Sequence, residues 1–177
     1  MKTTLIYGIA TAFAGTLLAC ILYFAGFHDS LEKMKTAQMI GMVAGILIWI
    51  TGMLLGLRAR RAEVPANEAF GYGRALGNGT LIALWASLFG TLGHILYMTV
   101  INPDMRDLIV RGELAKMEER GMSAAQIDQA EGMVRMMTGP IPQGIIVLIF
   151  SFVICFVLAL IISAFVQRPA SGSPQAG

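Results

Sequence analysis

Residues 144–166 read GIIVLIFSFVICFVLALIISAFV, and this stretch contains no charged side chain. A helix needs about 20 apolar residues to cross roughly 30 Å of hydrocarbon. A charge at the centre of a bilayer costs roughly 3 kcal/mol on insertion scales, so long uncharged stretches are typical of membrane spans. We therefore expect a membrane-spanning helix over about residues 141–166.

Three further uncharged stretches precede this one, at residues 3–27, 36–57 and 75–103. Because a backbone in lipid must satisfy its own hydrogen bonds, we expect each of them to be helical. The sequence thus predicts an all-α membrane protein with a four-transmembrane-helix bundle. The expected spans are about 4–27, 37–57, 75–101 and 141–166, in a single domain over residues 1–167 that is followed by a disordered tail, 168–177.

The composition agrees with this prediction. Hydrophobic residues make up 56% of the 177 residues and charged residues only 14%, whereas a soluble domain carries about 25% charged residues. The net charge is only +2, and the chain lacks the basic face that a nucleic-acid-binding protein presents. Cys20 and Cys155 both lie inside apolar stretches without metal-ligand spacing, so we interpret them as small packing residues.

The first apolar stretch has an alternative interpretation, because Leu17-Leu18-Ala19-Cys20 resembles a loose lipoprotein cleavage box. Leu18 is too bulky for its place in such a box, and the apolar run continues to Phe27 where a mature lipoprotein would become polar. We therefore expect this stretch to remain in the protein as a span.

Basic residues at the end of the second stretch predict the orientation. Arg58, Arg60 and Arg61 follow it directly, and dense arginine beside a span marks the cytoplasmic side. With four spans, both termini then lie in the cytoplasm, and the protein is expected in the inner membrane. The same three arginines are candidate contacts for anionic lipid headgroups, although topology anchoring alone also explains them.

The link between the third and fourth spans is expected to form an extramembrane amphipathic helical hairpin over about residues 103–138. Asn102 and Pro103 are typical of a helix start, and Gly121 of a helix end. Ser123 with Gln126 three residues later matches a capping box that begins a second helix. Six of the twelve methionines lie in this link, so its apolar face is a candidate surface for a partner or for the membrane.

Small residues recur on one face of each span. The second span carries Gly41, Gly45, Gly52 and Gly56, and small residues at this spacing allow helices to approach closely in a membrane. The third span carries small residues with Ser87 and His94 on one face, and bulky residues such as Trp85 on the other. We expect a bundle with the small faces inside and the bulky faces toward lipid, although a homo-oligomer could also use one of these faces.

His94 is the one ionisable side chain well inside a span, which makes it, with Ser87 on the same face, a candidate intramembrane polar site. The sequence offers it no carboxylate partner, so a neutral histidine bonded to a serine or a backbone carbonyl is the plainer interpretation. His28 and Asp29 lie together at the end of the first span, but the further ligands of a metal site are missing.

Motifs of catalysis are not found in the chain. Paired carboxylates, HExxH, serine–histidine–aspartate sets and CxxC are all missing. The glycine-rich residues 71–79 lack the strand and the lysine of a nucleotide-binding loop. We therefore expect no catalytic residue, no cofactor and no metal site, and a protein that is not an enzyme.

The order of several short motifs resembles the bacterial domain of unknown function 4199 family, over nearly the whole chain. These motifs are Tyr72-Gly73-Arg74-Ala75-Leu76, Asn102-Pro103-Asp104-Met105, the charged helix break at residues 120–127, and Pro142-Gln143-Gly144. Met105 and His94 depart from the family pattern, because both replace aromatic residues. The resemblance implies a four-span membrane protein and supplies no activity.

Two functional hypotheses remain. The first is a non-enzymatic interaction or structural protein of the inner membrane, in contact with the lipid bilayer and with a protein partner through the hairpin or the small-residue faces. The second is a small transporter or channel-type subunit with His94 in the bundle interior. A transporter should carry polar or broken helices near the membrane midplane, and only His94 and a few hydroxyl groups meet that criterion.

Overall fold

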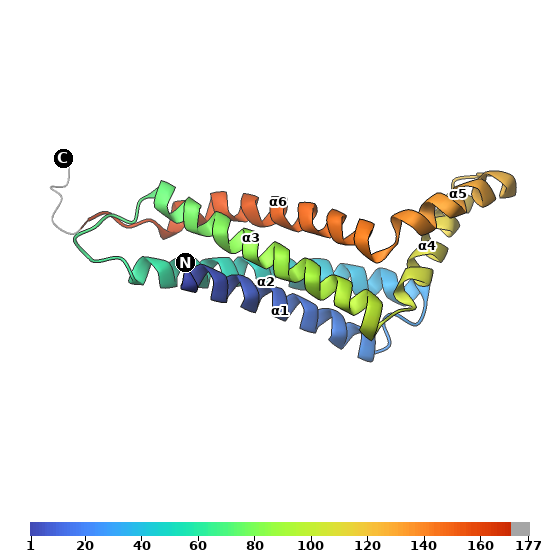
Figure 1. The fold of residues 1–177 in the computed structure, drawn as a ribbon, viewed down its shortest axis with the longest axis horizontal. Helices are drawn as coiled ribbons and strands as arrows, with labels where there is room; N and C mark the ends of the chain where they lie inside the picture. The colour runs from blue at the N-terminus through green and yellow to red at the C-terminus, as the bar shows by residue number, and fades with distance from the viewer. Residues whose placement is uncertain (171–177) are drawn as a thin grey trace.

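The computed structural model describes residues 1–170, and the part of the chain that it describes is helical apart from short loops and one isolated bridge (Figure 1). The elements, in chain order, are α1 (Lys2–Phe24), α2 (Leu31–Ala62), α3 (Tyr72–Leu96), the π-helical turn η1 (Tyr97–Ile101), α4 (Met105–Glu119), α5 (Ala124–Met137) and α6 (Pro140–Val166). Four segments are long and apolar enough to cross a membrane, namely α1, α2, α3 with η1, and α6. The predicted all-helical fold with four such helices is confirmed.

Helix α2 is longer than the uncharged stretch that predicts it. It begins at Leu31 rather than near residue 37, because the Ser30 side chain caps it by accepting a hydrogen bond from the backbone N–H of Lys33 at 3.3 Å. Its first turns therefore contain charged residues. The uncharged stretch marks the part that lipid could cover, whereas capping decides where the helix begins.

Helix α3 lies at the centre of the bundle, between α1 and α6 (Figure 1). It contacts both of these helices extensively, and α2 contacts α1, α6 and α3. Trp85, expected to face lipid, is half-buried, and its Cβ packs directly against Gly8 of α1. The missing side chain at Gly8 lets the two helices approach closely, so a bulky residue is accommodated at this contact.

The N-terminus and the last described residues lie at the same end of the bundle, and α4 and α5 lie at the opposite end (Figure 1). At the first end Phe70 and Arg168 form an antiparallel bridge, with N···O distances of 2.8 and 2.9 Å. Arg168 also donates from Nη2 to the backbone oxygens of Val64 at 2.9 Å and Pro65 at 3.0 Å. The predicted disordered tail is thus wrong at Arg168, whose guanidinium satisfies loop carbonyls. Residues 171–177 lie outside the described residues.

Asn102 does not cap α4 as expected. The turn η1 continues α3 to Ile101, and the Asn102 side chain donates to the hydroxyl of Tyr97 instead. Asp104 takes the cap position of α4 without a side-chain bond. The capping box of Ser123 and Gln126 is confirmed, and Gly121 separates α4 from α5 with a φ of +78° that favours glycine.

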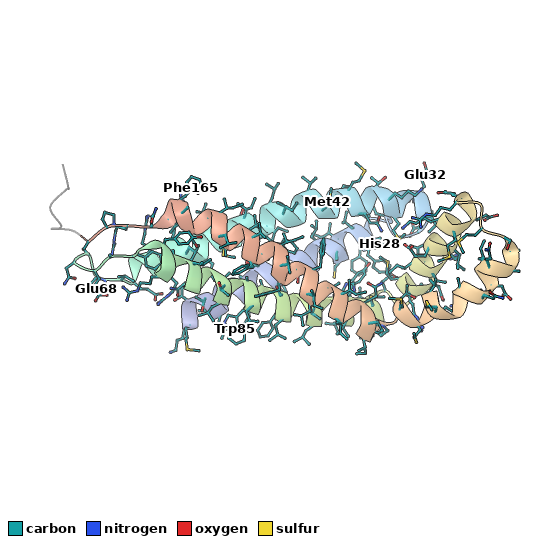
Figure 2. All side chains as sticks on the ribbon, turned by 90° about the horizontal axis from the view of Figure 1, so that it is seen from above. His28, Glu32, Met42, Glu68, Trp85 and Phe165 are labelled. Carbon is teal, nitrogen blue, oxygen red and sulfur yellow. The ribbon has the colours of Figure 1, made fainter. Side chains whose placement is uncertain are left out.

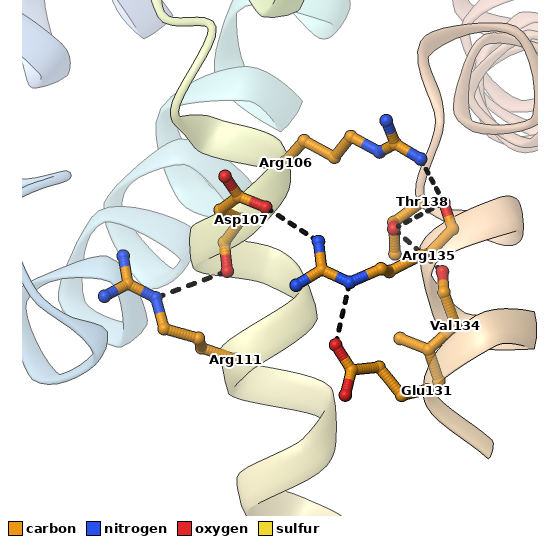
Figure 3. A network of polar contacts seen from close by, with 7 residues as sticks. All are labelled: Arg106, Asp107, Arg111, Glu131, Val134, Arg135 and Thr138. Carbon is orange, nitrogen blue, oxygen red and sulfur yellow. Dashed lines mark hydrogen bonds and ion pairs between the residues drawn. The ribbon is translucent and has the colours of Figure 1, made fainter. Parts of the chain in front are cut away.

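Polar contacts join the start of α4 to the end of α5 (Figure 3). Arg135 pairs with Asp107 at 3.0 Å and with Glu131 at 2.8 Å, and Arg106 donates to the backbone oxygen of Arg135 at 2.6 Å. Helix α4 also lies close to the start of α2, since a Cβ at Gly112 would be 3.4 Å from the Leu31 side chain. This arrangement places α4 over one end of the bundle.

Candidate functional site

A half-open cavity of about 350 Å³ lies between the helices in the half of the bundle nearer to α4. Side chains of α1, α2, α3 and α6 line it, together with His28 from the α1–α2 loop and Met105 at the start of α4. Much of its wall consists of glycine and alanine, namely Ala12, Gly15, Ala19, Ala37, Gly41, Gly45, Ala86, Gly90 and Gly93. The cavity exists because these residues leave the space between the helices unfilled.

The glycines of α2 show this directly. A Cβ added at Gly41 or Gly45 would meet no heavy atom within 4 Å, although both residues line the cavity. A Cβ at Gly52 would overlap the Thr11 side chain, and one at Gly56 would lie 2.7 Å from Cδ1 of Ile82. The predicted close-contact face of α2 therefore divides into one part that touches its neighbours and one part that borders open space.

The structure brings both residues of the candidate intramembrane polar site, Ser87 and His94, to the cavity wall. The Ser87 hydroxyl donates to the backbone oxygen of Ala83 at 2.8 Å. The buried Nε2 of His94 has no hydrogen-bond partner among the described residues, so the expected bond to a serine or a backbone carbonyl is absent at this atom. Neighbouring wall residues such as Gly90 and Gly93 carry no polar side chain that could supply one.

A chain of polar contacts closes the end of the cavity beneath α4. The side-chain N–H of Asn102 donates to Tyr97 Oη at 3.0 Å, and Tyr97 Oη lies 2.6 Å from His28 Nδ1. Tyr23 packs edge-to-face against Tyr97, with ring centroids 6.2 Å apart. The π-helical turn that carries Tyr97 is a form often found at functional sites.

These contacts are compatible with one particular tautomer of His28. Because Asn102 donates to Tyr97, the hydroxyl hydrogen of Tyr97 is free to point at His28 Nδ1, and in that tautomer the imidazole proton lies on Nε2. Burial lowers the pKa of His28, and the opposing effect of Asp29 is smaller. His28 is therefore neutral at neutral pH.

Sequence reasoning missed Tyr97 and did not connect it with His28. One signal was available, because Tyr97 follows His94 by three residues and so shares its helix face. The contact with His28 joins residues 69 positions apart in the chain. It depends on how α1 and α3 pack, which no local pattern states.

Trp49 of α2 and Cys155 of α6 line the end of the cavity away from α4. No Asp, Glu, Lys or Arg lines the cavity. Within residues 1–170 no group of three His, Cys, Asp or Glu side chains is arranged to hold a metal ion. Asp29, considered with His28 for a metal site, pairs with Lys33 at 3.4 Å.

The three arginines considered as lipid contacts have different environments. Arg60 donates from Nε to Asn78 Oδ1 at 2.9 Å and forms an ion pair with Glu63. Arg61 donates to the backbone oxygen of Val166 at 3.2 Å, which satisfies the C-terminal end of α6. Arg58 is exposed. Of the three, Arg58 is thus the side chain most open to a headgroup.

Glu63 joins this end of the bundle to the N-terminus. It accepts a hydrogen bond from the hydroxyl of Thr3 as well as the ion pair from Arg60. The Thr3 hydroxyl, and then Arg60, hold the pKa of Glu63 below its usual value. The end of the bundle that carries the termini is thus joined by polar contacts from α1, α2 and α6.

Comparison with protein families gives one match. Residues 6–168 match the family described as a protein of unknown function, DUF4199. No curated protein and no solved structure is significantly similar to the chain. Because the family match covers nearly the whole chain, the chain belongs to this family, as the resemblance predicted.

Proposed function

We propose that this member of the DUF4199 family is an integral membrane protein that binds a small hydrophobic molecule inside its helical bundle and does not act as an enzyme. The single observation that carries the proposal is the cavity among the four apolar helices. Its volume of about 350 Å³ lies within the range of about 300–1,000 Å³ that is usual for ligand pockets.

The outer surface of the bundle supports insertion in a membrane. Phe13, Met42 and Phe165 are 67%, 63% and 81% exposed, and Met42 and Phe165 point away from the bundle (Figure 2). Soluble monomers rarely expose contiguous apolar surface of this extent. Lipid covers such a surface without cost, so α1, α2, α3 with η1, and α6 are proposed to span the bilayer.

The proposed topology follows from the charges at the two ends. Arg58, Arg60 and Arg61 lie at the end with the termini, which assigns that end to the cytoplasm of an inner-membrane protein. Helices α4 and α5 then form an extracytoplasmic hairpin, whose charged side chains, among them the network around Arg135, favour water (Figure 3).

Labelling with a membrane-impermeant thiol reagent tests this topology. In a Cys20→Ser, Cys155→Ala background, Glu118→Cys should react from outside in intact cells or spheroplasts, and Asn67→Cys only after lysis. Both positions are exposed. Reaction of Asn67→Cys from outside would overturn the orientation, and reaction of both from the same side would overturn the four spans.

The chemistry of the wall supports binding rather than catalysis. The hydroxyls of Ser87 and Ser151 donate to backbone oxygens of their own helices, so neither is paired with a base. A nucleophile needs such a base within hydrogen-bonding reach. A transporter or channel-type subunit is a second candidate, which the position of His94 on the wall of an internal cavity favours. Flux into proteoliposomes would support that alternative.

Purification from native membranes tests the binding proposal. The wild-type protein and Gly45→Leu should be purified in parallel, and the small molecules that accompany them identified by mass spectrometry. We expect one compound to accompany the wild type in a near-equimolar amount. The same compound should be depleted in Gly45→Leu, because leucine fills the cavity. Identical profiles for the two proteins would contradict the proposal.

A further inference from the structure

The geometry of the cavity points to an uncharged, single-chain amphiphile, whose hydroxyl or carbonyl head lies at the His28 end and whose hydrocarbon tail extends toward Trp49. This inference rests on the proposed function and specifies its ligand. Three features of the cavity carry it: the charge of its wall, its length, and the unequal polarity of its two ends.

The wall excludes a charged ligand. No acidic or basic side chain other than histidine lines the cavity, and His28 is neutral at neutral pH. An ion that enters such a space loses part of its hydration without gaining a counter-charge, which costs free energy. Ligands with a phosphate, carboxylate or ammonium head are therefore disfavoured.

The cavity is long and narrow. Its lining on α2 runs from Met34 to Trp49, which at a rise of 1.5 Å per residue is roughly 22 Å. Its lining on α3 and the adjoining η1 runs from Ala86 to Tyr97, roughly 16 Å by the same rise. A volume of about 350 Å³ spread over such a length accommodates one hydrocarbon chain and not the two chains of a bilayer phospholipid.

The middle of the cavity offers a ligand few hydrogen-bond donors. The hydroxyls of Thr11 and Thr16 donate to the backbone oxygens of Tyr7 at 2.7 Å and Ala12 at 3.1 Å. Ser87 is bonded in the same way. Their hydrogens are thus used inside their own helices. His94, one helical turn before Tyr97 and so toward the His28 end, keeps an unpartnered ring nitrogen, while the glycines and alanines present only apolar surface.

The His28 end is different. Figure 2 shows His28 at the end of the bundle that adjoins α4. In the tautomer with its proton on Nε2, His28 has a donor that its bond to Tyr97 does not use, and Gln38 of α2 contributes an amide to the cavity wall. An alcohol or carbonyl head can accept from such donors without carrying charge.

Trp49 is a built-in reporter for the tail. The chain has two tryptophans, so Trp85→Phe leaves Trp49, which lines the cavity, as the only one. In nanodiscs of zwitterionic lipid, we would titrate three probes that carry bromine, a fluorescence quencher, at the tail end: 11-bromoundecanol, its sulfate ester, and the matching trimethylammonium compound. We expect saturable quenching by the alcohol and at least tenfold weaker apparent affinity for both permanently charged probes.

Three controls complete the experiment. Trp49→Phe, which keeps Trp85 outside the cavity, measures quenching by probe that is merely dissolved in lipid. Gly45→Leu, with Gly41→Leu as a second variant, should abolish the saturable component. The isomer 2-bromoundecanol, with bromine beside the head, should quench Trp49 much less than 11-bromoundecanol does.

The outcomes separate the two proposals. The charged and uncharged probes could bind wild type with equal affinity, and Gly45→Leu could lose the binding of both. That result would overturn the ligand class and leave the proposed binding function intact. Stronger quenching by 2-bromoundecanol would overturn the orientation of the ligand. If none of the probes gives saturable quenching that depends on Gly45, both the ligand class and the binding function are overturned.

Discussion

The half of the bundle beside the Phe70–Arg168 bridge and the half beneath α4 carry the same kinds of small residues and differ in what surrounds them. In the first, which we call the dense half, Gly52, Gly56 and Gly79 touch neighbouring helices, and a Cβ at Gly79 would lie 2.9 Å from Cβ of Ala159. In the second, the hollow half, Gly41 and Gly45 border the cavity.

This difference teaches that glycine spacing permits a close helix contact but does not produce one. In the dense half the glycines face Thr11, Tyr7 and Ile82, which fill the space that the glycines leave. In the hollow half Thr16 packs against Gly93, but no side chain takes that place at Gly41 and Gly45, where the space remains as a cavity. The dense half therefore supplies stability, and the hollow half keeps the space in which we propose that a ligand binds.

The largest expected effect comes from Gly52→Leu. Its side chain would overlap Thr11 across the contact between α1 and α2. Insertion of this size into a filled core costs about 3 kcal/mol, because the helices must separate. Thermal unfolding of the purified protein, monitored as the loss of monodisperse protein, should show a strongly reduced Tm. Alternatively, no folded protein should be obtained. A wild-type Tm would refute the description of the dense half.

Gly45→Leu, one heptad earlier on the same helix, should have the opposite effect on stability. Nothing lies within 4 Å of its Cβ position, and leucine favours helix over glycine by about 0.8 kcal/mol, so Tm should be unchanged or higher. Ligand binding should weaken at least tenfold. Gly77→Leu is the matched control, because Gly77 is exposed on α3 outside the cavity and the same substitution there should leave binding intact.

The hollow half should also respond to pH, because it contains His28. The pKa of His28 in the folded protein lies below the ordinary value of 6.5, because burial disfavours the charged ring. The stability that neutral His28 contributes is therefore fully present above about pH 6.5 and is lost as the pH falls through its lowered pKa. Unfolding at pH 8 and pH 5 should show a larger loss for wild type than for His28→Gln. Equal losses would contradict this assignment.

The smallest expected effect is that of Arg135→Ala. Its ion pairs with Asp107 and Glu131 are exposed, and such pairs contribute less than about 1 kcal/mol. Global unfolding should barely change. Hydrogen exchange should become faster in α5, which has no buried residues of its own, while α3 keeps its protection. A large fall in Tm would mean that α4 and α5 help hold the bundle together.

Much of the fold could be predicted from local sequence. Long uncharged stretches identify the four apolar helices, because the cost of burying charge acts on each stretch separately. The Ser123 capping box is likewise local and is confirmed. The sequence did not predict that α2 begins as early as Leu31, where Ser30 caps it, and the predicted cap at Asn102 is wrong because its side chain donates to Tyr97 instead.

The site could be predicted only in part. The spacing of Ser87 and His94 predicts that they share an inward face, and both line the cavity. The cavity itself could not be predicted, because identical glycines border open space at position 45 and a filled contact at position 52. That difference depends on which side chains of other helices face each glycine, and this is set by the whole bundle.

The measurement that tests the account most directly is the thermal shift produced by 1-undecanol in nanodiscs. A ligand at 100 times its Kd stabilises the folded state by about 2.7 kcal/mol. We predict a saturable rise in Tm for wild type and for Gly77→Leu, and none for Gly45→Leu. The same shift in all three proteins would show that the alcohol acts through the bilayer, and it would contradict a ligand cavity in the hollow half.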